Sequence, residues 1–361
     1  MFDDNIIAMK DFLRRVLVTV IIFISLSLMI RAAHDVRLSL YPMGLSVILI
    51  LLTYLWAKEL MGRWWALLPT FLLGFSPTFL AYSHKVSGDI NFSLALVISM
   101  LAFLGLLSSR SKLIILLSGL SLGMALFISW QAFILIPYFI LLLIGHYFVG
   151  REHHWLKFIL AVLIAIGFNL TAAFIIYQSI GNYFNAALLN LQILINASKV
   201  SWPGDFFFKE PLPSLIMIVF AFIISLGKFL KSFWLIFFRR SRIWLDYLNT
   251  HFLEFSMTLF IIFWLRKIMI SEDGDAVRHF LPLLPFLYIL TAGVIKRWFS
   301  LDEIKKIRNF LVRLFVMSEE LVAISIKSLL LAVFLIWYFI TALMAAPDFD
   351  KYVNVLERLF N

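Results

Sequence analysis

Of the 361 residues in this chain, 63% are hydrophobic and only 14% are charged, and the formal net charge is +10. Soluble domains average about 45–50% apolar and about 25% charged residues, so the composition excludes a soluble globular protein and predicts one that crosses the membrane many times. The absence of cysteine excludes disulfides, thiolate nucleophiles and cysteine metal sites. In so apolar a chain, the positive charge favours basic loops beside anionic lipid over a nucleic-acid partner.

Eleven apolar runs are long enough, or nearly long enough, to cross a hydrocarbon core of ~30 Å. In chain order they are Val16–Ile30, Leu38–Ala57, Trp65–Ala81, Phe92–Leu107, Leu113–Ile128, Ala132–Val149, Phe158–Tyr177, Leu212–Leu226, Phe252–Leu265, Phe280–Ile295 and Ser328–Ala346. Only three residues separate the fifth run from the sixth, and Pro137 favours a hairpin there over one long broken segment. The sequence therefore predicts an all-α, polytopic transmembrane helical bundle of about eleven spans. We expect residues 1–361 to form a single transmembrane domain with no separate soluble domain.

The first apolar run is not followed by a small-residue cleavage site, so we expect a retained helix and not a removed signal peptide. An orientation with the N-terminus in the cytoplasm puts about twice as many Lys and Arg residues inside as outside, which is the bias of membrane proteins. We therefore expect an integral protein of the cell (plasma) membrane, with the C-terminus outside.

Two kinds of connecting segment stand out. Residues 178–211 form a long outer loop whose middle, residues 185–196, reads as an interfacial helix. Residues 228–249 and 296–320 are basic, and we expect them to be amphipathic helices lying on the inner leaflet. No glycine-rich phosphate loop occurs in an inner segment, so ATP coupling within this chain is not expected.

A charged cluster lies on the predicted outer face, where the third run ends. His84, Lys85 and Asp89 crowd together there within a few residues. Ionisable groups at membrane depth are candidates for function. The alternative is an ordinary solvated loop, with Lys85 reaching to the interface and His84 holding a structural position.

The stretch Ser76–Ser83, followed by Asp89, resembles a signature of the polytopic lipid-carrier-dependent glycosyltransferases of the C superfamily. That superfamily includes the protein O-mannosyltransferases and the aminoarabinose transferases of lipid A. Further passages fit the same pattern in the same order over roughly residues 31–354. These are Arg37–Gly62, Phe208–Pro213 with its Lys-x-Pro-Leu-Pro-like sequence, Arg278–Phe286, and more weakly Pro347–Asn354.

The resemblance implies a reaction in which a sugar on a polyprenyl-phosphate carrier passes to a protein, lipid or glycan acceptor on the outer face. It implies that Asp89 is an acid of the active site. The cations and histidines that could bind the donor phosphate are His84, Lys85, Lys209, Arg278 and His279. Arg278 is the best of them, because a guanidinium grips phosphate oxygens in a bidentate manner. Alternatives are headgroup contacts for the lysines and an ion pair with Asp275 for Arg278.

The first outer loop departs from the family pattern, because the family has a long loop with an acidic pair. Here the loop is only Arg31–Arg37, and Asp35 is its single acid. As the catalytic base, Asp35 would work with Asp89, and the two would hold a divalent metal or divide metal binding and proton transfer between them. The alternative for Asp35 is an ion pair with Arg31 or Arg37.

The short first loop also leaves two other possibilities. One is a non-catalytic relative of the same fold: a transporter, a flippase or a partner subunit. Few charges fall near the membrane midplane and no two halves of the chain match, which disfavours the transporter. The other is that the family's first helix is absent, which would put Asp3 and Asp4 outside as the acidic pair. The basic residues Lys10, Arg14 and Arg15 argue against that arrangement.

Overall fold

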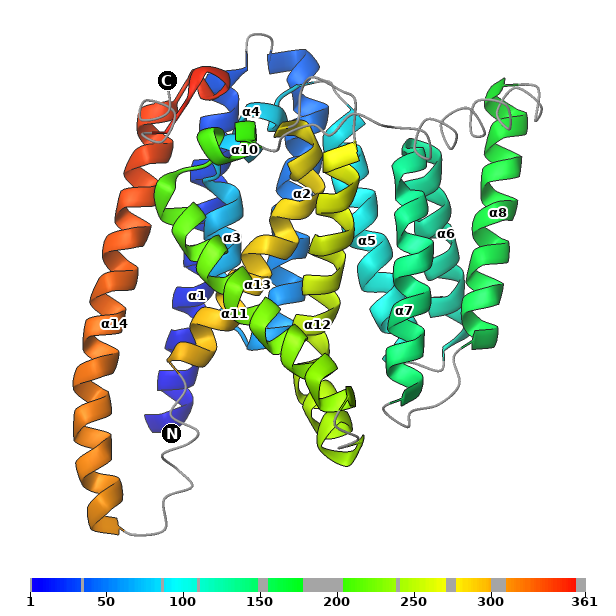
Figure 1. Cartoon of the computed structure of the whole chain (residues 1–361). Helices are drawn as coiled ribbons and strands as arrows, with labels where there is room; N and C mark the ends of the chain where they lie inside the picture. The colour runs from blue at the N-terminus through cyan, green and yellow to red at the C-terminus, as the bar shows by residue number, and fades with distance from the viewer. Residues whose placement is uncertain are drawn as a thin grey trace.

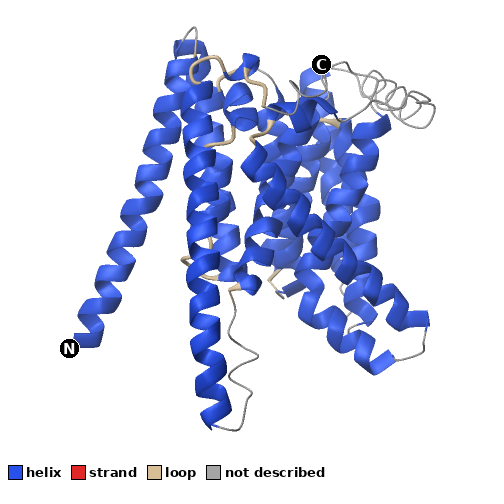
Figure 2. Ribbon diagram, turned by 60° about the vertical axis from the view of Figure 1, so that its left-hand side comes forward, coloured by secondary structure: helices blue, strands red, loops and turns tan. Residues whose placement is uncertain are grey.

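In the computed structural model, the described residues are 2–33, 36–85, 88–108, 111–148, 155–177, 204–237, 241–270, 277–299 and 310–354. Every regular element among them is helical (Figures 1 and 2). The first half holds α1 (Phe2–Ala32), α2 (Val36–Met61), α3 (Leu67–Gly74), α4 (Pro77–Ser83), α5 (Gly88–Ser108), α6 (Lys112–Ile128), η1 (Trp130–Ile134), α7 (Leu135–Phe148) and α8 (Trp155–Tyr177). The second half holds α10 (Gly204–Lys209), α11 (Leu212–Phe237), α12 (Ser241–Ile270), η2 (Val277–Leu283), α13 (Leu284–Trp298), α14 (Phe310–Ala345) and η4 (Phe349–Lys351).

The all-helical membrane bundle predicted from the composition is confirmed. Among the described residues, seven helical segments are long and apolar enough to cross a membrane, and α6 and the η1–α7 segment are shorter apolar helices. The remaining predicted runs fall on α12 and on the pair α3–α4. The chain turns between α6 and α7 at Ser129, whose Oγ accepts from the Gln131 amide, so the predicted hairpin is present.

The third predicted run is a broken helix, and a proline causes the break. Pro77 has no N–H, so the Leu73 carbonyl accepts instead from the Ser76 amide at 3.3 Å. The Leu72 carbonyl is then available to the Tyr338 hydroxyl, which donates to it at 2.6 Å. Ser76 caps α4 by accepting from the Phe79 amide. The break therefore places a short, buried helix, α4, at one end of the bundle (Figure 1).

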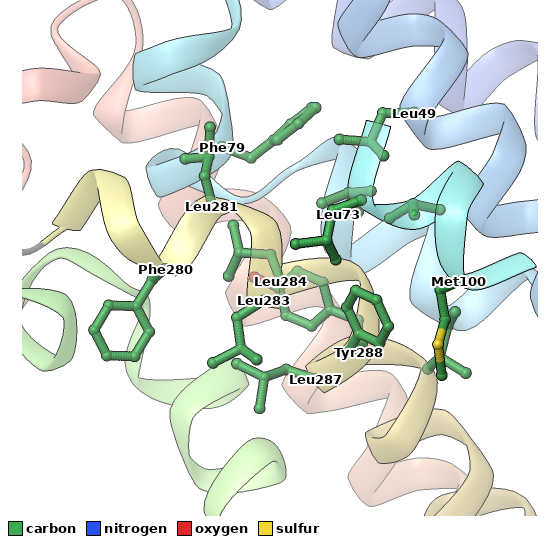
Figure 3. Close-up of a cluster of buried hydrophobic side chains, with 14 of the residues drawn as sticks. Leu49, Leu73, Phe79, Met100, Phe280, Leu281, Leu283, Leu284, Leu287 and Tyr288 are labelled. Atoms are coloured by element: carbon green, nitrogen blue, oxygen red, sulfur yellow. The ribbon is translucent and has the colours of Figure 1, made fainter. Parts of the chain in front are cut away.

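The core of the bundle surrounds η2 and α13, whose side chains are almost all buried. Figure 3 shows Leu281, Leu284 and Tyr288 lying among side chains from α3, α4 and α5. Phe286 makes ring contacts with Trp56 of α2 and with Phe260 of α12, 5.2 and 4.2 Å between centroids. Because α13 lies at the centre of this core, it positions the neighbouring segments that carry the candidate site residues.

Helices α6 and α8 pack closely through small residues. A Cβ placed on Gly119 would lie 2.7 Å from the Ala161 carbonyl oxygen, and one on Gly123 would lie 3.1 Å from Ala165 Cα. Small residues four apart let membrane helices approach in this way. Asn169 secures the contact by donating to the Gly123 carbonyl at 3.0 Å.

The two ends of the bundle differ. The chain begins at one end, called here the N-terminal end, while α4, α10 and the C-terminal segment 346–354 lie at the other, called here the α4 end (Figure 1). Within the C-terminal segment, η4 packs against α4. Asn354 fixes it to α10, because its Nδ2 donates to the carbonyls of Phe207 and Glu210, both at 2.6 Å.

One expectation about the basic segments is wrong. Residues 228–249 are not a separate surface helix, because α11 continues to Phe237 and α12 begins at Ser241. The physical reason lies in a buried carboxylate at this end: Glu254 Oε2 accepts from Lys228 at 3.2 Å and from Arg297 at 2.9 Å. These basic side chains compensate Glu254 and tie together α11, α12 and α13. In the second basic segment, α13 ends at Trp298 and α14 begins at Phe310, and residues 300–309 lie outside the described part.

Candidate functional site at the α4 end

The predicted site residues gather around η2. This segment packs against α4, α5, α10 and α12, and it carries Arg278 and His279 itself. Its contact with α10 includes a stacked pair, Phe206 and Phe280, with ring centroids 4.0 Å apart. The elements that carry His84, Asp89 and Lys209 therefore meet at one segment.

His84 and Lys85 follow the end of α4. His84 Nδ1 lies 3.1 Å from the Leu80 carbonyl oxygen, as expected for a residue that ends a helix. The Lys85 ammonium stands 4.7 Å from the centre of the Tyr82 ring. Both side chains are half-buried. These contacts fit the structural alternative for His84 and leave the predicted phosphate contact of either residue untested.

His279 contacts a buried lysine that the motifs did not single out. Lys267 and His279 are each only 6% exposed. Lys267 Nζ lies 3.1 Å from His279 Nδ1 and 2.7 Å from Gln131 Oε1, and it stands 5.3 Å from the centre of the Trp264 ring. If the ammonium donates to Nδ1, the neutral imidazole carries its proton on Nε2. The arrangement fixes the position of a buried cation against η2, the segment that also carries the half-buried Arg278.

Asp89 lies at the same level of the bundle as Lys267. Phe92 of α5 and Trp264 of α12 have ring centroids 5.8 Å apart. Asp89 precedes Phe92 by three residues and Lys267 follows Trp264 by three, while α5 runs away from the α4 end and α12 runs toward it. Each residue is therefore about 4.5 Å nearer that end than the ring pair. Asp89 is half-buried in the first turn of α5, where the helix dipole favours a carboxylate.

Asp35, the other predicted acid, lies outside the described residues, as do Asp275 and the predicted interfacial helix at 185–196. Lys209 is described: it is the last residue of α10, half-buried and directly before Glu210. The structure thus places Asp89, Lys209, Arg278 and His279 around η2 and leaves the pairing of Asp89 with Asp35 a prediction.

Next to this group lies a second buried acid, Glu210, with four hydroxyl partners. Its Oε2 accepts from Ser76 at 3.0 Å and from Thr78 at 2.8 Å. Its Oε1 accepts from Tyr288 at 2.6 Å and lies 2.8 Å from the Ser214 hydroxyl. Glu210 is fully buried. We call these five residues the Glu210 cluster.

The Glu210 cluster joins the motifs that carried the family resemblance. Ser76 and Thr78 come from the stretch Ser76–Ser83, and Glu210 comes from Phe208–Pro213. Tyr288 lies in α13, the helix that begins within Arg278–Phe286. Asn354 of the C-terminal passage binds the backbone carbonyl of Glu210. These motifs therefore meet at one structural joint, where α4, α10, α11 and α13 come together.

Burial and hydrogen bonding act in opposite directions on the pKa of Glu210, and burial has the larger effect. Burial raises the pKa of its carboxyl above 4.5, and the hydroxyl bonds, that of Tyr288 first, lower it in part. Ser214 Oγ lies 2.8 Å from both Glu210 Oε1 and the Pro211 carbonyl, but its one proton serves one acceptor at a time. A neutral carboxyl can donate to Ser214, which then donates to Pro211. Burial also raises the pKa of nearby Tyr352.

The described residues do not form a metal site by themselves. No three His, Asp or Glu side chains converge in the described part of the chain. Asp89 is the only described member of the predicted pair of metal ligands, and one carboxylate does not make a site for a divalent ion. No step below depends on a metal.

The comparisons with known proteins fit this geometry. The sequence matches the family model described as dolichyl-phosphate-mannose-protein mannosyltransferase over residues 18–177, which is less than half of the chain. The comparison with curated proteins gave no match.

Two structures of an archaeal enzyme resemble the fold. The oligosaccharyltransferase AglB from Archaeoglobus fulgidus, in complex with an inhibitory peptide and a dolichol-phosphate, gives a TM-score of 0.50 at 15% identity over 88% of this chain. The Archaeoglobus fulgidus oligosaccharyltransferase in complex with Zn and sulfate gives 0.48 at 15% identity over 90% of this chain. The matches cover 45% and 42% of those longer chains, so this chain spans less than half their length.

The chain therefore has an all-helical membrane fold that resembles the AglB structure, and residues 18–177 match the mannosyltransferase family model, in line with the resemblance of its motifs. Sequence reasoning missed Lys267, Gln131 and Glu210. Lys267 had one usable signal, since it forms a basic pair with Arg266 directly after the apolar run Phe252–Leu265. Glu210 lies within a quoted motif, but a lone Glu there does not reveal that four hydroxyls from distant segments surround it.

Proposed function

We propose that this protein is a membrane glycosyltransferase that moves a sugar from a polyprenyl-phosphate carrier to a protein, lipid or glycan acceptor at the α4 end. One observation carries the proposal: η2 joins the helix of Asp89 to the buried pair Lys267–His279 and to Arg278. A half-buried carboxylate beside fixed cations is what transfer from a phosphate leaving group requires. The family match and the fold support the same class of reaction.

Each group has a role in this proposal. Asp89 takes the proton of the acceptor hydroxyl or amide as the acceptor atom forms its bond to the anomeric carbon. The bond between that carbon and the phosphate oxygen breaks, and its electron pair stays on the carrier phosphate. Lys267 and Arg278 stabilise the negative charge that develops there, and His279 and Gln131 hold Lys267 in place.

Two parts of the proposal rest on residues beyond the described part of the chain. Asp35 would act with Asp89, and the two would hold a divalent ion. Dialysis against EDTA followed by addition of Mg²⁺ or Mn²⁺ measures this directly. A transfer rate that EDTA does not change removes the metal from the proposal and leaves Asp89 as the base.

The proposal also puts the α4 end outside the plasma membrane and the N-terminal end in the cytoplasm. The chain has no cysteine, so single cysteines report sidedness cleanly. Lys351→Cys at the α4 end should react with an impermeant maleimide in intact cells, and Lys112→Cys at the opposite end should react only after permeabilisation. The reverse pattern would overturn the orientation.

The test of function is transfer of a radiolabelled sugar by the purified protein in liposomes that contain a polyprenyl-phosphate-linked sugar. Membrane extracts supply candidate acceptors. Transfer by the wild type that falls in Arg278→Lys supports the proposal, because an ammonium cannot reproduce the bidentate grip of guanidinium. No transfer by the wild type with any donor tried would favour the non-catalytic relative.

A further inference from the structure

An apolar groove runs along the surface of the bundle between α1, α3 and α14, and none of its lining residues takes part in the proposed reaction. Its volume is about 650 Å³, within the range of small-molecule sites. Its lining side chains are aliphatic or aromatic, among them Leu17 and Ile21 of α1, Phe71 of α3, and Leu331, Leu335 and Phe339 of α14. In a protein that crosses the membrane, such a groove suits an acyl chain.

The groove is closed toward the α4 end and begins near the N-terminal end. Phe75 and Phe339 meet in an edge-to-face contact, 4.9 Å between centroids, and Tyr338 beside them binds the Leu72 carbonyl. From Leu331 to Phe339 the groove follows α14 for about 12 Å, which is less than half of a ~30 Å hydrocarbon core. The groove therefore runs over part of the hydrocarbon core, from Trp64 and Trp65 at one end to the contact between Phe75 and Phe339 at the other.

A buried cation lies on α1 one helical turn before the first groove-lining residue. Arg14 precedes Leu17 by one helical turn and is 8% exposed, although it lies in the first turn of a candidate membrane span. Its Nε has no hydrogen-bond partner among the described residues, and its Nη1 lies 3.2 Å from Asp11 Oδ1. Both oxygens of Asp11 are also bound by Arg63, at 3.1 and 3.0 Å. Two guanidinium groups thus share one carboxylate, and this cluster has one positive charge in excess.

We propose that this groove is a site for an anionic phospholipid, with one acyl chain along α1, α3 and α14 and the phosphate on Arg14 and Arg63. The excess charge matches an anionic headgroup, and guanidinium binds phosphate oxygens through directed N–H groups. Trp64 and Trp65 lie beside the cluster, at the depth where tryptophan marks the membrane interface.

A phospholipid fits better than the tail of a sugar carrier. The groove opens at the N-terminal end, whereas Asp89, Lys267 and Arg278 lie at the α4 end, and the rings of Phe75 and Phe339 separate the two. The bound lipid would also join α1 and α14, two of the three least buried candidate spans. This inference is independent of the proposed function.

The test is a lipid titration followed by native mass spectrometry of the delipidated full-length protein. Phosphatidylglycerol and phosphatidylcholine with identical acyl chains are compared. The wild type should retain phosphatidylglycerol in preference to phosphatidylcholine. Arg14→Gln should weaken phosphatidylglycerol binding about tenfold or more, the effect of losing a charged hydrogen bond. The matched control is Arg15→Gln, which removes the same charge from the exposed neighbouring residue and should bind like the wild type.

A second variant tests the groove without changing charge. Ala332 lines the groove from an exposed position on α14, so Ala332→Phe should fill it, lower phosphatidylglycerol retention and leave the fold intact. Elution volume in size-exclusion chromatography confirms folding for each variant. Equal retention of both lipids by the wild type, wild-type retention by Arg14→Gln, or displacement of phosphatidylglycerol by an equal amount of a polyprenyl phosphate would each overturn the proposal.

Discussion

The α4 end holds two buried polar groups, and each is stabilised by a different kind of hydrogen-bond partner. The Glu210 cluster surrounds a fully buried carboxyl with four neutral hydroxyls, all from the protein interior. Lys267, in contrast, binds an amide oxygen and the imidazole nitrogen of His279, which follows the half-buried Arg278 in η2. The Glu210 cluster joins helices, whereas Lys267 supplies a buried positive charge next to η2.

We expect the two groups to have different roles: the Glu210 cluster stabilises the fold, whereas Lys267 contributes to the reaction. A buried acid whose hydrogen bonds are complete inside the protein has no capacity left for a substrate, and its removal affects folding. A buried cation next to partly exposed charges can contribute to binding an anion, and its removal affects the reaction. Substitutions in the two groups should therefore change different measurements.

The largest effect is expected at Lys267. Lys267→Met keeps the length and apolar stem of the side chain and removes the charge, so it should lower the rate of sugar transfer by about 10²–10³. Its thermal midpoint should stay close to that of the wild type. Lys351→Met, at an 80% exposed position of the same end, serves as the control and should transfer normally. A folded Lys267→Met protein with wild-type transfer would break the distinction.

Glu210→Ala should act on stability. It leaves buried hydroxyls without their acceptor, and each such group costs about 1–3 kcal/mol. We expect a large fall in the thermal midpoint in detergent, measured by loss of the monodisperse chromatographic peak, or failure to accumulate. Glu59→Ala makes the same change at a 78% exposed side chain and should be nearly silent. Full stability of Glu210→Ala would show that the cluster is not a joint.

A smaller loss is expected at Tyr338. Tyr338→Phe keeps the ring packing against α3 and removes the donor to the Leu72 carbonyl, so it should cost about 1–3 kcal/mol. Tyr41→Phe, at a 63% exposed residue, is the matched control. Equal thermal midpoints for the two variants would show that the bond from Tyr338 does not stabilise the helix break at Pro77.

The smallest effect is a dependence on pH. The pKa of Glu210 is raised in the folded state, so the folded protein binds more protons than the unfolded one between 4.5 and the raised value. Stability should therefore fall as the pH rises through that window, by at most about 1.4 kcal/mol per unit. Glu210→Gln should flatten this slope in thermal midpoints recorded across the window. An unchanged slope would assign it to other groups.

Much of the fold could be predicted from the sequence, because apolar runs of membrane length leave the backbone few alternatives to helices. The break at Ser76–Pro77 was visible as a proline within a run, but its consequence was not. The bond from Tyr338 to Leu72 joins residues far apart in the chain, and no local pattern announces it.

The site was predicted in part. Asp89 was named because charges stand out beside apolar runs, and Arg278 and His279 because of the family resemblance; η2 brings their elements together, and their roles stay predictions. Lys267 was counted only as an outer charge, since its burial depends on Gln131 and His279, which arrive from other helices. The basic segment 228–249 was misinterpreted for a related reason: its partner, Glu254, lies in the middle of α12.

The most direct test of the central claim is transfer by Asp89→Asn compared with Asp348→Asn. Both variants remove one carboxylate charge at the α4 end, but Asp348 is an exposed residue paired with Lys351. With the wild type and both variants at matched amounts in liposomes with a radiolabelled polyprenyl-phosphate sugar, Asp89→Asn should lose transfer while staying folded, and Asp348→Asn should retain it. Unchanged transfer by Asp89→Asn would contradict the account.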